Sequence, residues 1–173
     1  DNYRELDKLT ESIDSTFNIG IRIASEEEPK FEFYTSRLGI GYKDIIPYYS
    51  QKIAEHPNAR LKMLHFFINT GIKDTAYYWN ELYKCLRVYA RLKKIAPEVD
   101  SLNIGGGFPI KTSLNFDYDY QYMVNEIVSQ IKKFCEEEGV EEPNIYTEFG
   151  SFTVGESGGH LYKIISQKRQ NDR

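Results

Sequence analysis

The sequence is poor in cysteine and has no long apolar run. Its 173 residues include only two cysteines, Cys85 and Cys135, both in amphipathic stretches. So few cysteines in a chain of this size argue against a disulfide framework and fit a reduced, cytoplasmic setting. No run of about 18 apolar residues is present, so we expect no membrane span. No secretory signal pattern is visible either.

The sequence also lacks a strong excess of charge of either sign. The formal net charge is -4, so neither nucleic acid nor an anionic membrane is expected as a partner. No metal site is expected. Hydrophobic residues make up 40% of the chain and charged residues 28%, as in an ordinary soluble domain. The 14 Tyr and 10 Phe favour a well-filled interior or an interface.

Short apolar runs alternate with longer amphipathic segments along the chain. We expect helices at 1–14, 42–55, 74–95 and 118–138, with Pro47 near the start of the second and Gly139 ending the last. We expect strands at 19–24, 61–69, 101–104, 144–148 and 161–166, and a polar loop at 26–30. This β-loop-α repetition predicts an α/β fold with a parallel sheet.

Two architectures fit such a pattern, an open doubly wound sheet and a (β/α)8 TIM barrel. Four βα-type units are visible, which is about half of a barrel. A complete barrel usually needs about 250 residues. If the chain has the barrel fold, we therefore expect it to form only part of a barrel.

The most distinctive segment is LNIGGGFP, residues 102–109. A strand that runs into Gly105, Gly106 and Gly107 exposes backbone N–H groups, which can hold a phosphate at the carboxyl end of the strand. The alternative is a tight turn without a ligand. The dinucleotide fingerprint and the Walker A pattern both fail, because each needs glycine where the chain has Ile110.

A second candidate segment is YTEFGS, residues 146–151. At the end of a strand, Glu148 can accept a hydrogen bond from a protonated ring nitrogen, and Gly150 can offer a backbone N–H to a phosphate. The alternative for Glu148 is an ordinary pairing with a surface lysine.

Two further strands carry side chains of interest. In MLHFFI, residues 63–68, period-2 alternation puts His65 and Phe67 on the same face, where Phe67 can stack on a planar ring. A lone histidine in an apolar strand is more often an ordinary core residue, which is the alternative for His65; Thr70 adds a hydroxyl beyond the strand end. Arg22 lies within an apolar strand, which indicates an interior ion pair, an anion site or an exposed edge.

In their order along the chain, these motifs resemble the ornithine/diaminopimelate/arginine decarboxylases with an alanine-racemase-like barrel, over residues 19–165. The resemblance implies pyridoxal 5'-phosphate as cofactor, bound as follows. The phosphate would lie on the residues of the glycine run and near Gly150, the pyridine nitrogen on Glu148, and the cofactor near Arg22, with His65, Phe67 and Thr70 around it.

The sequence departs from this family at several positions. Phe67 stands where the family has a ring-stacking histidine, and Thr70 stands in place of a serine. Ser151 stands where the family has a phosphate-binding arginine, so the phosphate would depend more on backbone groups. No lysine lies in the family's Ala-x-Lys-Ala-Asn context, and the family's Cys-Asp segment is absent.

The resemblance therefore implies the central part, roughly the second half of the barrel, of a longer homodimeric enzyme that decarboxylates a basic amino acid. Arginine is the first expectation; diaminopimelate, ornithine and lysine remain open. We expect a partial barrel at 1–159 and, at 160–173, the start of a connection to a C-terminal β domain. The segment by itself is expected to be inactive. Two alternatives stay open: a non-catalytic or inhibitor-like relative, and an unrelated α/β barrel that binds a phosphate ligand.

Overall fold

Five parallel strands form a single sheet in the order β2-β1-β3-β4-β5. The computed structural model describes residues 3–25, 38–68, 70–111 and 116–167. The strands are β1 (Phe17–Ala24), β2 (Ile40–Gly41), β3 (Ala59–Phe66), β4 (Ser101–Asn103) and β5 (Asn144–Tyr146). Apart from the two-residue β2, which pairs with the end of β1, neighbouring strands follow chain order, as they do in a barrel.

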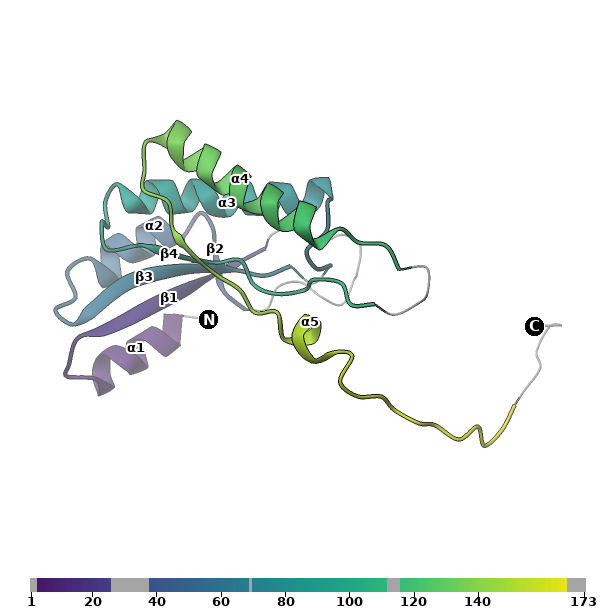
Figure 1. Cartoon of the computed structure of the whole chain (residues 1–173). Coiled ribbons are helices and arrows are strands. Elements are labelled where there is room, and N and C mark those ends of the chain that lie inside the picture. The colour runs from purple at the N-terminus through teal and green to yellow at the C-terminus, as the bar shows by residue number, and fades with distance from the viewer. Residues whose placement is uncertain (1–2, 26–37, 69, 112–115, 168–173) are drawn as a thin grey trace.

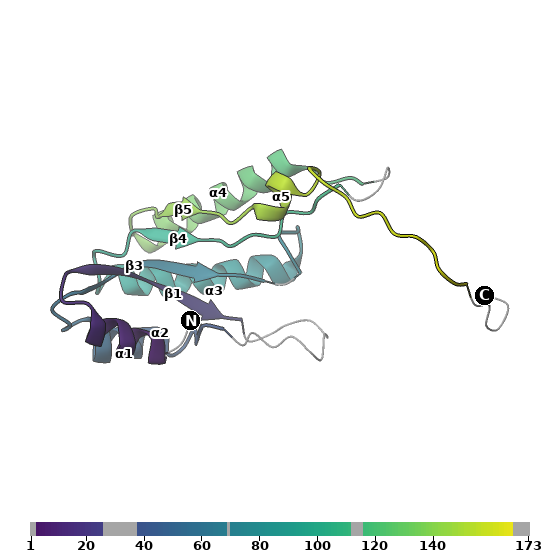
Figure 2. The ribbon, with the colours of Figure 1, turned by 90° about the horizontal axis from the view of Figure 1, so that it is seen from below.

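The helices cover mainly one face of this sheet. They are α1 (Tyr3–Ser12), α2 (Ile45–Tyr48), the π-helix η1 (Tyr49–Ile53), α3 (Ala76–Lys93), α4 (Tyr120–Glu138) and α5 (Gly150–Val154). Figure 1 shows α2, α3 and α4 on the same side, whereas α1 lies along β1 away from them. In the view of Figure 2, the opposite side of β3 and β4 carries no helix of the described chain.

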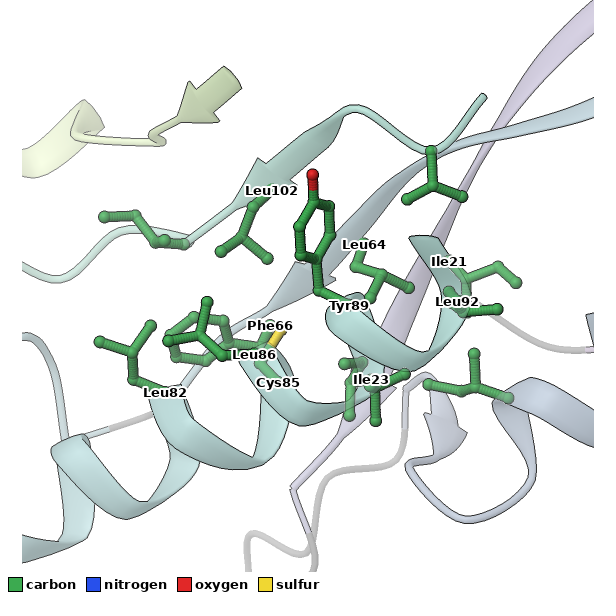
Figure 3. Close-up of a cluster of buried hydrophobic side chains, with 14 of the residues drawn as sticks. Ile21, Ile23, Leu64, Phe66, Leu82, Cys85, Leu86, Tyr89, Leu92 and Leu102 are labelled. Atoms are coloured by element: carbon green, nitrogen blue, oxygen red, sulfur yellow. The ribbon is translucent and has the colours of Figure 1, made fainter. Parts of the chain in front are cut away.

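The core lies between the sheet and α3. Alternate residues of the strands, such as Leu64 and Leu102, point at Leu86 and Tyr89 of α3, and all four are fully buried (Figure 3). Each such side chain contributes about 1.5–3 kcal/mol through burial of apolar surface. Since strand side chains alternate, the residues between them point to the uncovered face.

Local signals set the ends of the two long helices. The Thr75 hydroxyl accepts a hydrogen bond from the Tyr78 N–H at the start of α3. Asp119 caps α4 in the same way, and Gly139 ends α4 with a left-handed φ of 64°. The helix expected at 42–55 is instead divided into α2 and η1, where the Ala54 N–H donates to the Tyr49 carbonyl five residues earlier. Pro47 lies in the first turn of α2, where no N–H is needed.

The prediction of a strand at 161–166 was wrong. Residues 161–167 form neither helix nor strand, and Leu161 and Ile165 are 102% and 91% exposed. After α5 the chain runs away from the sheet (Figure 1), so no neighbouring backbone satisfies its hydrogen-bonding groups as a strand. The helix α5 and the short β2 were not expected, and the loop expected at 26–30 lies outside the described residues. Within the described residues, no helix has the length and apolar character that crossing a membrane requires.

Candidate functional site

The register of the sheet aligns four side chains across its uncovered face. Arg22 of β1 pairs with His65 of β3, His65 with Asn103 of β4, and Asn103 with Tyr146 of β5. We call these four residues the polar row. They lie toward the carboxyl ends of the strands, where parallel α/β folds bind ligands. The structure thus brings together Arg22 and His65, which the sequence indicated, with Asn103 and Tyr146, which it did not.

The glycine loop, residues 105–107, follows β4 directly. Gly105 and Gly107 have φ values of 70° and 103°, which strongly favour glycine. A Cβ on Gly106 would collide with the Glu148 carbonyl oxygen, and a Cβ on Gly107 would lie 2.8 Å from the Gly71 Cα. The loop is therefore pressed between the loops that follow β3 and β5.

The glycine loop uses carbonyl groups, but not all of its N–H groups, in contacts with the neighbouring loops. The Gly105 carbonyl accepts from the Glu148 N–H at 2.9 Å, and the Gly107 carbonyl accepts from the Ile72 N–H at 2.9 Å. By contrast, the N–H groups of Gly106 and Gly107 donate no hydrogen bond to any described residue. A fixed loop with free N–H groups matches a phosphate cradle better than an unconstrained turn.

Glu148 lies beside this loop, and its partners are not surface lysines. Its Oε1 accepts from the Asn103 Nδ2 at 2.8 Å and lies 3.6 Å from the His65 Nε2. The Glu148 side chain is 53% exposed, so the carboxylate keeps access to the uncovered face.

His65 is held in a largely apolar setting. Its side chain is 18% exposed, and its buried Nε2 has no hydrogen-bond partner among the described residues. Burial lowers the pKa of His65, and the positive charge of Arg22 lowers it further, although the Glu148 carboxylate opposes the shift. His65 therefore favours the neutral form beside the carboxylate.

Arg22 and Phe67 contact each other next to the same loop. The Arg22 guanidinium carbon lies 5.5 Å from the centroid of the Phe67 ring, a cation–π contact. Within the part of the chain that the structure describes, the buried Arg22 Nε has no hydrogen-bond partner. The Phe67 ring also borders Gly105, with its Cδ2 3.3 Å from where a Cβ of that glycine would be.

The two remaining predicted site residues, Thr70 and Gly150, make no contact with the described residues that points to a ligand. Thr70 is half-buried in the loop after β3; the neighbouring Asn69 lies outside the described residues. The Gly150 N–H donates to the Glu148 carbonyl at 2.9 Å, so a phosphate would have to share or displace that contact. Among the described residues, no three His, Cys, Asp or Glu side chains gather as metal ligands would.

Phe108, Phe149 and Tyr118 form an aromatic cluster that contacts the loops around the site. The sequence pattern did not indicate this cluster. The Phe108 ring lies 4.4 Å from the Phe149 ring and 5.9 Å from the Tyr118 ring, measured between centroids. The Tyr118 hydroxyl donates to the Ile72 carbonyl at 2.8 Å. The loops after β3, β4 and β5 are thus joined by side chains as well as by backbone.

Comparison with known proteins identifies the family. Residues 1–155 match the family described as pyridoxal-dependent decarboxylase, pyridoxal binding domain. The chain belongs to the pyridoxal-dependent decarboxylases. This excludes the unrelated phosphate-binding barrel and confirms the family inferred from the ordered motifs.

The curated relatives of this chain include biosynthetic arginine decarboxylases. That of Geotalea uraniireducens is 32% identical over 118 residues, which cover 64% of this chain and 19% of the relative. That of Citrifermentans bemidjiense is 27% identical over 181 residues, which cover 96% of this chain and 28% of the relative. The chain thus spans less than a third of the length of these relatives.

Solved decarboxylase structures share the fold. The lysine decarboxylase of Selenomonas ruminantium superposes with a TM-score of 0.69 at 20% identity, covering 88% of this chain and 38% of that one. The arginine decarboxylase of Campylobacter jejuni gives 0.61 at 22% identity, covering 85% of this chain and 25% of that one. These similarities confirm the expected α/β fold as part of an alanine-racemase-like barrel.

Proposed function

We propose that this chain supplies the cofactor-binding contacts of a pyridoxal-phosphate-dependent decarboxylase that acts on a basic amino acid. Arginine is the first candidate, with diaminopimelate, ornithine and lysine as alternatives. The observation that carries the proposal is the position of Glu148 beside the glycine loop: its N–H donates to the Gly105 carbonyl, and Asn103 hydrogen-bonds both its carboxylate and the Gly105 N–H. A carboxylate and a free N–H cradle side by side suit a ligand with a basic ring nitrogen and a phosphate.

The described residues fit pyridoxal phosphate. The free N–H groups of Gly106 and Gly107 would bind the phosphate, on a loop whose close approach to the Glu148 and Gly71 backbone leaves no room for side chains at these two positions. Glu148 would accept from the ring nitrogen. Phe67 would lie against the ring, with Arg22 next to it, as their contact indicates.

When bound, pyridoxal phosphate supplies an electron sink that lowers the barrier to loss of a carboxyl group. Glu148 would hold the proton at the ring nitrogen, which strengthens that sink. The glycine N–H groups would fix the position of the phosphate, and Phe67 would exclude water from one side of the site. The neutral His65 next to Glu148 leaves the carboxylate available to the ring nitrogen rather than neutralising it.

Other parts of the enzyme would come from beyond these contacts. We propose that the lysine that holds the cofactor and the Cys-Asp segment are not contributed by residues 1–173. Residues 160–173 would lead toward a C-terminal β domain, and the complete enzyme would be a cytoplasmic homodimer. The chain by itself would then bind cofactor without releasing carbon dioxide.

A binding experiment tests the cofactor site. The probe is 4-deoxypyridoxine 5'-phosphate, which has no aldehyde and so cannot react with surface lysines. We expect the chain to bind it by isothermal titration calorimetry, and Glu148→Gln to weaken binding about tenfold, about 1.4 kcal/mol. The matched control Glu156→Gln, on the exposed stretch after α5, should bind as the unchanged chain does. If the unchanged chain does not bind the probe, the proposed cofactor site is refuted.

A second experiment tests the reaction. Release of carbon dioxide from labelled arginine, lysine, ornithine and diaminopimelate is measured with the natural polypeptide that contains this chain. We expect release from one of the four, arginine first. Release from none, despite cofactor binding, would instead favour the non-catalytic relative, which Phe67 and Ser151 make the specific alternative.

A further inference from the structure

We propose that Asn103 is a positioning residue that fixes the Glu148 carboxylate and the glycine loop relative to each other. One side chain would then set the spacing between the contact for the ring nitrogen and the contact for the phosphate. This inference rests on the proposed function, and goes beyond it by assigning a role to a residue that acts through its contacts with Glu148 and Gly105.

The amide of Asn103 uses both of its ends. Its Nδ2 donates to the Glu148 Oε1 at 2.8 Å, and its Oδ1 accepts from the Gly105 N–H at 2.8 Å. The first contact joins residues 45 positions apart in the chain, and the second closes a local turn of two residues. Asn103 therefore connects the carboxylate to the first glycine of the loop directly.

The chemistry of the partners determines how this amide is oriented. An ionised carboxylate can only accept a hydrogen bond, and a backbone N–H can only donate one. The nitrogen of Asn103 must face Glu148 and its oxygen must face Gly105, so the flipped amide is excluded. A hydroxyl is too short to make both contacts, and an aliphatic side chain makes neither.

The contacts of Glu148 leave one of its oxygens available. Both the Asn103 and the His65 contacts fall on Oε1. Among the described residues, Oε2 has no hydrogen-bond or ion-pair partner. Because the Glu148 N–H also donates to the Gly105 carbonyl, backbone and side chain of Glu148 are both tied to the glycine loop. Holding Oε1 fixes the direction in which Oε2 is presented to a donor.

The test uses Asn103→Ser and Asn103→Leu. The serine hydroxyl can still accept from the Gly105 N–H but does not reach Glu148, so the turn is kept and the carboxylate is released. Leucine removes both contacts. Asn18→Ser is the matched control, because Asn18 is exposed at the amino end of β1. Spectra of the backbone amides confirm that each variant is folded.

Two measurements are made with 4-deoxypyridoxine 5'-phosphate labelled with ¹⁵N in the ring. Asn103→Ser should weaken binding about tenfold, about 1.4 kcal/mol. It should also lower the pH at which the bound ring nitrogen loses its proton, which a purely structural role would not do. In a Glu148→Gln background, both effects of Asn103→Ser should disappear, because residues that act as a unit are not additive.

The possible failures are distinguishable. If the unchanged chain does not bind the probe, the proposed function fails and this inference fails with it. If the chain binds and Glu148→Gln weakens binding, but Asn103→Ser leaves affinity and ring protonation unchanged, only the role of Asn103 is refuted. An equal loss in both Glu148 backgrounds also refutes it, because Asn103 would then act by another route.

Discussion

The carbonyl oxygen of Gly107 occupies the place where a side chain on Gly71 would begin, 2.5 Å from the Cβ position. The contact is reciprocal, since a Cβ on Gly107 would lie 2.8 Å from the Gly71 Cα. Two loops from neighbouring strands thus approach as closely as bare backbone allows. The phosphate cradle that we propose depends on this approach, because it holds the Gly107 peptide in place.

Replacing Gly107 by alanine should therefore destabilise the fold. Its φ of 103° is unfavourable for alanine, and the new methyl would meet the Gly71 backbone. We expect a loss of about 2 kcal/mol or more in the free energy of unfolding, measured with urea. Gly139→Ala, with a φ of 64° and nothing within 4 Å of its Cβ, should lose about 1 kcal/mol. Equal losses in the two variants would contradict the importance of the contact.

The pH dependence of stability should show the burial of His65. Its pKa in the folded protein lies below the ordinary value of 6.5 because burial disfavours the charged form. Below pH 6.5 the unfolded chain therefore binds more protons than the folded chain does. The stability that His65 contributes is present above pH 6.5 and is lost as the pH falls through its folded pKa. When the free energy of unfolding is measured with urea at decreasing pH below 6.5, His65→Gln should show a smaller decrease than the unchanged chain. His160→Gln, on the exposed C-terminal stretch, should show the same decrease as the unchanged chain.

The hydrogen bond from Tyr118 to Ile72 offers a test of the aromatic cluster. Tyr118→Phe keeps the ring on Phe108 but removes the donor, and we expect a loss of about 1 kcal/mol in the free energy of unfolding. Tyr122→Phe, on the exposed side of α4, is the control and should lose less. No difference between the two variants would show that the hydroxyl of Tyr118 adds nothing.

The same tyrosine should affect stability in alkali. Burial, with smaller effects of Tyr120 and Asp74, raises the pKa of Tyr118 from 10.0 to about 12. The unfolded chain loses this proton first, so the contribution is complete below pH 10 and is lost as the pH rises toward 12. Urea unfolding at increasing pH should show a smaller alkaline decline in Tyr118→Phe than in the unchanged chain.

Ser151 gives a gain-of-function test. The resemblance to the decarboxylase family implies a phosphate-binding arginine at this position, and in this chain Ser151 is exposed at the start of α5. Ser151→Arg should strengthen binding of 4-deoxypyridoxine 5'-phosphate about tenfold, through a charge-assisted contact. Val154→Arg adds the same charge one turn later on α5 and should change affinity less. An equal gain in affinity in the two variants would show that any added positive charge attracts the phosphate, without a specific contact from position 151.

Much of the fold was predictable because its signals are local. Thr75, Asp119 and Gly139 each mark a helix end by chemistry that acts within a few residues, and the alternation around His65 gave the correct faces of β3. The segment at 161–166 has the same apolar character, but a strand needs a neighbouring backbone, which sequence alone does not reveal.

The site was predictable only in part. Glycines and charged residues at strand ends are visible in the sequence, and their order indicated the family. Asn103 was missed because its role depends on the pairing of β4 with β5, which brings Glu148 within reach. One signal was available: an asparagine two residues before a glycine commonly accepts that residue's N–H. This signal would have indicated the local contact to Gly105 but not the distant contact to Glu148.

The polar row also has a consequence for how the chain folds. Its members come from four strands, and the long helices α3 and α4 separate three of those strands in the sequence. Contacts between residues so far apart form slowly, because the intervening chain must first be closed into a loop. The polar row is therefore complete only when all four strands have paired. A ligand that binds at the polar row would bind only the folded state, and would therefore shift the folding equilibrium toward that state by mass action.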